Sequence, residues 1–111
     1  MTKPVVKGVP QVLKKKKKQK FYLYGDDIQE EFEVRLTKHV DLGQPLGQLL
    51  WKGTIKKENK GVWIAEVDRV DDLSADEPGD MELVDVTVIN SAGTPSSPFP
   101  TGVMPILPDF P

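Results

Sequence analysis

The sequence predicts a mainly β protein, folded as a small antiparallel β-sandwich or a small barrel, with an extended N-terminal arm and a proline-rich C-terminal tail. Three observations support this fold class. Apolar residues alternate with polar ones in several segments, as they do in half-buried strands. Glycine, asparagine and proline punctuate these segments with turn signals. The chain has 111 residues and is 38 % hydrophobic, enough for one core but not for two ordinary domains.

One segment, residues 27–40, shows the alternation most clearly. Phe32, Val34 and Leu36 fall on one side of an extended strand, and Glu31, Glu33, Arg35 and Thr37 fall on the other. The same segment also permits a short helix, because Ile28 and Phe32 lie near helical spacing. The period of two is cleaner than the helical one and favours a strand.

A β-hairpin is predicted in the middle of the chain. Two strand-like segments, residues 49–57 and 62–70, flank the sequence ENKG. In this sequence Asn59 and Gly61 tolerate the positive φ of a tight turn. Residues 81–90 are rich in β-branched side chains and predict another strand. The core predicted from these strands comprises Val34, Leu36, Ile55, Trp63, Val67, Val86 and Val88.

Charge is strongly segregated along the chain. Residues 1–20 contain eight lysines and no acid, a charge of +8, whereas residues 21–111 contain 7 basic and 17 acidic residues, a charge of −10. Like charges in a block repel one another and resist packing. Residues 1–20 are therefore predicted to form an extended basic arm. Its predicted partner-binding residues are Lys14, Lys15, Lys16, Lys17, Lys18 and Lys20.

An alternative is that the arm folds back onto its own domain. In that case its lysines would pair with the acidic residues that follow the aromatic stretch, namely Asp26, Asp27, Glu30, Glu31 and Glu33.

Residues 91–111 are predicted to form a tail after a β domain that spans residues 21–90. The tail contains six of the ten prolines, which remove backbone donors and are excluded from helix interiors and central strands. Its apolar side chains are too numerous for a solvated linker and are expected to lie on a neighbouring surface. The predicted partner-binding residues of the tail are Phe99, Met104, Ile106, Leu107 and Phe110.

The sequence contains no recognisable catalytic set. With His39 as its one histidine and no cysteine, a single chain cannot assemble a metal site rich in nitrogen or sulfur ligands. The acidic residues between positions 68 and 80 lack the spacing of a helix–loop–helix calcium site, which leaves calcium binding there a minor alternative. No serine has an evident base and orienting group beside it. We therefore expect no enzymatic activity, no cofactor, no metal and no small-molecule ligand.

Nucleic acid is one candidate partner of the lysine cluster. Lysines attract a phosphate backbone through counterion release, and Phe21, Tyr22 and Tyr24 follow at once as rings that can stack on bases. The arm contains no arginine, the side chain that reads base edges in a bidentate manner. Contact with nucleic acid would therefore be nonspecific, and the acidic remainder of the chain would oppose it.

Residues 82–98, ELVDVTVINSAGTPSSP, resemble the last two strands of fibronectin type III and immunoglobulin-like domains. In those domains a strand ends in an Asn-x-x-Gly turn and a Ser/Pro-rich edge strand follows. The resemblance implies an immunoglobulin-like or similar sandwich, in which Trp51 and Trp63 are candidate core tryptophans.

Assembly with other proteins is the function that the sequence favours. Opposite charges on the arm and the domain can steer and register a contact, and the apolar tail can supply contact area. We expect a non-enzymatic structural subunit of a homo-oligomer or hetero-assembly, for which a phage or viral virion component (capsid decoration, neck or tail protein) is the best guess by analogy. No apolar segment approaches the ~18 residues of a membrane span, so we expect synthesis in the cytoplasm. The alternatives are a nonspecific nucleic-acid-associated accessory protein and a monomeric adaptor whose tail is a proline-rich ligand.

Overall fold

The computed structural model describes residues 3–10, 13–14, 17–41, 44–45, 47–70 and 82–104. Within these ranges all regular secondary structure is β-strand, which confirms the prediction of a mainly β protein. The strands are β1 (Val5–Gly8), β2 (Leu13–Lys14), β3 (Lys18–Asp26), β4 (Glu33–Lys38), β5 (Leu49–Asn59), β6 (Val62–Arg69), β7 (Glu82–Ile89) and β8 (Phe99–Met104).

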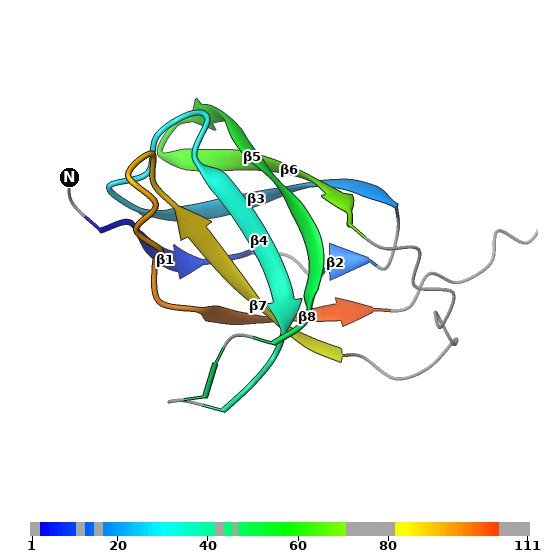
Figure 1. The fold of residues 1–111 in the computed structure, drawn as a ribbon. Coiled ribbons are helices and arrows are strands. Elements are labelled where there is room, and N and C mark those ends of the chain that lie inside the picture. The colour runs from blue at the N-terminus through cyan, green and yellow to red at the C-terminus, as the bar shows by residue number, and fades with distance from the viewer. Residues whose placement is uncertain are drawn as a thin grey trace, which may run out of the picture.

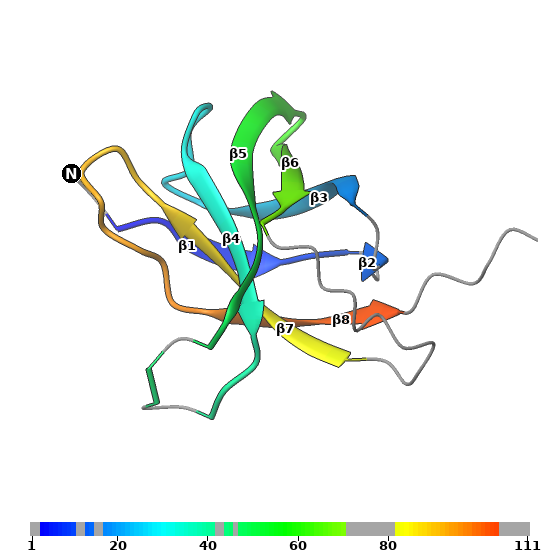
Figure 2. The same cartoon turned by 45° about the vertical axis from the view of Figure 1, so that its right-hand side comes forward.

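These strands belong to one sheet with the order β1-β3-β6-β5-β4-β7-β8-β2. Neighbours are antiparallel except β2 and β8, which pair in parallel. The sheet curls around its own inner face into a nearly closed barrel (Figure 1 and Figure 2). The core thus lies inside a single curved sheet, and the β-sandwich that the resemblance implied is not confirmed.

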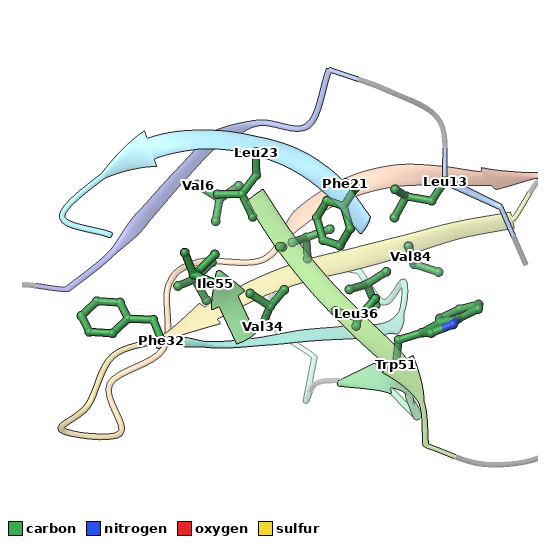
Figure 3. Close-up of a cluster of buried hydrophobic side chains, with 14 of the residues drawn as sticks. Val6, Leu13, Phe21, Leu23, Phe32, Val34, Leu36, Trp51, Ile55 and Val84 are labelled. Carbon is green, nitrogen blue, oxygen red and sulfur yellow. The ribbon is translucent and has the colours of Figure 1, made fainter. Parts of the chain in front are cut away.

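The N-terminal segment spans the seam of this barrel. β1 pairs with β3 at one end of the strand order, and β2, a few residues later in the chain, pairs with β8 at the other end. Val6 and Leu13 are buried in the core (Figure 3). An arm outside the sheet is therefore not confirmed. Burial of the apolar residues of the N-terminal segment stabilises the fold, while Lys7 stays on the exposed side of β1.

Gly8 allows β1 to pack closely against β3. The pairing register shifts between Val6 and Gly8, as at a β-bulge. A Cβ atom at position 8 would collide with the ring of Tyr24. The aromatic ring therefore occupies the space that any other residue at this position would need.

The predicted hairpin is confirmed as β5 and β6, which end in the pair Asn59 and Val62. The two residues between them, Lys60 and Gly61, have φ angles of 54° and 82°. Positive φ at both central positions is the geometry of the two-residue turn that fits the twist of a hairpin. The sequence predicts positive φ at Asn59 and Gly61. Asn59 is instead the last residue of β5, and Lys60 takes the first position of the turn.

The predicted core is confirmed except at its tryptophan. Six of its members are 0 % exposed, namely Val34, Leu36, Ile55, Val67, Val86 and Val88. Trp63 is only partly buried, and the tryptophan in the core is Trp51, which is 2 % exposed. Trp63 lies opposite Leu23 next to the hairpin turn. Trp51 lies opposite Leu36, with its side chain among the buried core residues (Figure 3).

The strand predicted within residues 27–40 is confirmed as β4, and the helical alternative is wrong. Phe32, Val34 and Leu36 are buried as expected. Thr37, predicted on the polar side, is also buried at 3 % exposure. The register against β5 shifts between Leu36 and Thr37, so a bulge interrupts the simple alternation at this point.

Part of the predicted tail also belongs to the sheet. β8 pairs with β7, and Phe99 packs against the core. Before β8, the Asn-x-x-Gly turn is present: Asn90 Oδ1 accepts hydrogen bonds from the backbone N–H groups of Ala92 and Thr94, and Gly93 has a φ of 85°. A tail that begins at residue 91 and stays outside the sheet is not confirmed. Residues 105–111 lie outside the described ranges.

Candidate binding surface

Alternate side chains of β3 point away from the core and form an ordered row on the outside of the barrel. This β3 row consists of Lys18, Lys20, Tyr22, Tyr24 and Asp26, all of them exposed, while the residues between them face inward. Tyr22 is 47 % and Tyr24 43 % exposed. Two large, half-exposed aromatic rings therefore lie between a basic end and an acidic end, and the ring of Tyr24 rests against Gly8 of β1.

Adjacent strands widen this surface. The register of β3 and β6 places Lys18 opposite Asp68, Lys20 opposite Glu66 and Tyr22 opposite Ile64. The Nζ atom of Lys20 and the Oε2 atom of Glu66 are 4.0 Å apart, an exposed contact of the kind that contributes little to stability. On the other side of β3, Val5 of β1 is 44 % exposed. Val5 lies opposite Asp26, so the centre of the surface is apolar on β3 and β6, and β1 adds an apolar side chain only at the acidic end.

The acidic end of the row is held by an ion pair from β1. Lys7 Nζ lies 2.8 Å from Asp26 Oδ2, with both side chains more than half exposed. The hydrogen bond to Asp26, and then its negative charge, raise the pKa of Lys7 above the ordinary value of 10.5. Lys7 therefore pairs with an acid of its own chain, as the fold-back alternative predicts for the N-terminal lysines.

The structure separates the members of the predicted lysine cluster. Lys18 and Lys20 belong to the β3 row, and Lys17 is exposed just before it. The backbone carbonyl of Lys17 accepts a hydrogen bond of 2.8 Å from the N–H of Arg69, which fixes the start of β3 against the end of β6. Lys14 lies in β2, and Lys15 and Lys16 are outside the described residues. Binding of a partner by these lysines remains a prediction.

The predicted tail residues are likewise dispersed. Phe99 is partly buried against the core of its own chain, which leaves less of its ring for a partner. Met104 ends β8. Ile106, Leu107 and Phe110 lie outside the described residues, so their proposed contact with a neighbour remains a prediction.

A cleft with a volume of about 490 Å³ lies on another side of the barrel, between the start of β4 and the turn that follows β7. Its lining includes Glu31, Glu33, Arg35 and Asn90. Arg35 Nε donates to Glu33 Oε2 at 2.7 Å, and Lys52 Nζ lies 3.3 Å from Glu33 Oε1. The carboxylate of Glu33 is therefore neutralised by two cations, and Asn90 is engaged in its turn. The cleft can hold a small polar group, but its charged side chains chiefly bind one another.

Sequence reasoning missed a contact between His39, which is exposed just after β4, and the buried Asp85 of β7. His39 Nδ1 lies 2.8 Å from Oδ1 of Asp85, whose side chain is only 3 % exposed. The backbone N–H of Val40 also donates to this carboxylate, at 3.4 Å. Within the described residues, Asp85 is the hydrogen-bond partner that orients the imidazole. The signal in the sequence was an acid within a β-branched strand, which alternation alone assigned to the solvent side.

Among the described residues, no cluster of three histidine or carboxylate side chains is placed to hold a metal ion. Residues 71–80, where calcium was the minor alternative, lie outside those ranges. The described part of the chain also contains no helix long and apolar enough to cross a bilayer. No protein-family model matches the chain, and no curated protein matches it.

Proposed function

We propose that this chain is a non-enzymatic subunit of a larger protein assembly, and that the outer face of β3 is a surface by which it binds a neighbouring protein. The observation that carries this proposal is the exposure of Tyr22 and Tyr24 within the β3 row. The core of the barrel has its own tryptophan and phenylalanine residues and does not need these rings.

Energetics supports a protein partner for this face. Burying the exposed apolar parts of the two tyrosines would stabilise a contact by about 3 kcal/mol at ~25 cal/mol per Å², before the costs of association. Tyrosine is enriched at interfaces because it joins a large apolar ring to a polar tip. The charges at both ends of the row can fix the register of such a contact.

The sequence prediction named a specific setting, a virion, whereas the present proposal names only a protein assembly. The virion component was inferred by analogy with small β subunits that extend arms, and the free arm and tail are not confirmed among the described residues. The proposal therefore specifies a protein assembly and leaves the particle open.

Site-specific photo-crosslinking in the native source tests this function. A benzophenone amino acid at position 22 or 24 is expected to give a protein adduct of defined mass. The same group at Lys38, an exposed residue of β4, serves as the control and is expected to give none. Equal labelling from all three positions, or no protein adduct from positions 22 and 24, would contradict the proposal.

Single-stranded nucleic acid is a second candidate, because two lysines and then two aromatic rings follow one another on the outer face of one strand. Basic grooves with stacking rings are typical of such binding. Against it, Glu66 and Asp68 lie directly opposite the two lysines of the row and repel phosphate. Nucleic-acid adducts from positions 22 and 24 in the same crosslinking experiment would favour this candidate over a protein partner.

A further inference from the structure

The β3 row is complementary to itself when one copy is reversed. Along the strand its outward residues are two lysines, two tyrosines and an aspartate, in that order. If a second copy lies across the first with its β3 antiparallel, Lys18 of each copy meets Asp26 of the other. Lys20 then meets Tyr24, a cation over an aromatic ring, and the two Tyr22 rings meet at the centre.

From this pattern we infer that the partner at the β3 row is a second copy of this chain, bound face to face about a two-fold axis near Tyr22. The inference rests on the proposed function and names its partner. A two-fold contact uses the same patch on both subunits and is closed. The row satisfies this requirement because its charges are opposite at equal distances from its centre.

The residues along the neighbouring strand β6 also carry opposite charges at equal distances from the centre. Asp68 lies beside the basic end of the row, and Lys60, in the turn before β6, is at the far end. Ile64 lies between them, opposite Tyr22. The antiparallel arrangement therefore brings the acidic end of β6 toward Lys60 of the other copy and places the two Ile64 side chains near the axis.

Charge also excludes the competing arrangement. With parallel strands, Lys18 would face Lys18 of the second copy and Asp26 would face Asp26, and like charges in direct opposition are destabilising. The ion pair of Lys7 with Asp26 does not prevent the antiparallel contact. A carboxylate accepts several hydrogen bonds, so Asp26 can bind Lys7 of its own chain and Lys18 of the other copy.

The extent of the surface sets the strength of the dimer. The row is about 26 Å long at ~3.3 Å per residue. Because the barrel is curved, only β3 and its neighbours touch, which buries roughly 400 to 500 Å² per copy, less than the ~800 Å² of a standard stable interface. An interface of this size is expected to be weak, and it weakens further as salt screens its charges.

Analytical ultracentrifugation of the full chain tests the inference. The wild-type protein is expected to pass from monomer to dimer with concentration, and Lys18→Glu or Asp26→Lys is expected to weaken the dimer on the order of tenfold, because each variant creates two repulsive contacts. Lys38→Glu and Asp41→Lys make the same charge changes at exposed residues off the row and are expected to have no effect. Circular dichroism of each variant checks folding.

An equimolar mixture of Lys18→Glu and Asp26→Lys gives the sharpest outcome. In the mixed dimer both contacts are attractive again, so association is expected to return to the wild-type strength and to stop at two chains. Larger species would indicate a head-to-tail chain and overturn the two-fold axis. A wild-type protein that stays monomeric at millimolar concentration would overturn the inference, yet the photo-crosslinking at positions 22 and 24 could still reveal another protein partner.

Discussion

Trp51 and Leu36 lie opposite each other on β5 and β4 and fill one end of the barrel interior. The guanidinium of Arg69 lies over the Trp51 ring, 5.4 Å from its centroid. Trp51 is 2 % exposed, whereas Trp63 is only partly buried. One tryptophan therefore belongs to the core and the other covers its edge.

We predict that the two tryptophans differ in their contribution to stability. Trp51→Ala should lower the free energy of unfolding by about 3 to 5 kcal/mol, since it leaves a large cavity. Trp63→Ala should cost about 1 to 2 kcal/mol, because part of its ring is already in solvent. Urea denaturation followed by circular dichroism measures both. A larger loss for Trp63→Ala than for Trp51→Ala would contradict the assignment.

The N-terminal segment is predicted to be part of the folding unit. Leu13 is 2 % exposed, and Leu13→Ala should cost about 2 to 5 kcal/mol as a buried large-to-small substitution. Lys7→Ala, on the exposed side of β1, serves as the control and should change stability by less than about 0.5 kcal/mol. If Leu13→Ala proves as mild as the control, residues 5–14 do not close the barrel and the arm inferred from the sequence is restored.

Asn90 is predicted to be important for the turn before β8. Its Oδ1 atom accepts two backbone hydrogen bonds, and Asn90→Ala leaves both donors without this partner. The expected cost is about 1 to 3 kcal/mol, measured by thermal or chemical unfolding. Thr94→Ala, at an exposed residue of the same turn, is the comparison. An Asn90→Ala protein as stable as the wild type would show that the turn does not depend on this side chain.

The ion pair at the end of the β3 row is predicted to be visible by titration. Because Asp26 raises the pKa of Lys7, Asp26→Asn should lower that pKa toward 10.5, as followed by NMR of the Lys7 side chain. The sign for stability follows from a raised folded-state pKa: the contribution of the pair is present below the unfolded value and is lost as pH rises through the folded value. No movement of the Lys7 pKa in Asp26→Asn would mean that the pair does not form in solution.

Strand positions were predictable where one face is buried and the other is wet. The alternation at Val34 and Leu36 follows directly from the inward face of a sheet. The valines of β7 also face inward, but Asp85 and Thr87 between them are buried as well, which alternation does not predict. The choice between Trp51 and Trp63 was not predictable, because both lie on strands of one hairpin. They differ in burial, since Trp51 is 2 % exposed and Trp63 is only partly buried, and burial depends on how the sheet closes.

The N-terminal segment was misjudged because its lysines outnumber its core residues. A block of positive charge predicts solvation. A strand can nevertheless join a sheet when it contributes one buried apolar side chain, as Val6 does in β1 and Leu13 in β2. The β3 row was partly predictable from the sequence, since residues 18–24 are basic and aromatic. Its order on one face became clear only when the structure showed that positions 18 to 26 form one continuous strand.

Chemical crosslinking of single-cysteine variants tests most directly whether two copies meet at the β3 row. The chain has no cysteine, and two sheets packed face to face are about 10 Å apart, so a bis-maleimide of that span can join opposed positions. Tyr22→Cys alone is expected to give a crosslinked dimer. Lys18→Cys and Asp26→Cys are each expected to give little product alone and a mixed dimer when combined. Crosslinking of Lys18→Cys to itself as efficient as that of the mixture, or no product from Tyr22→Cys, would contradict an antiparallel two-fold contact at this face.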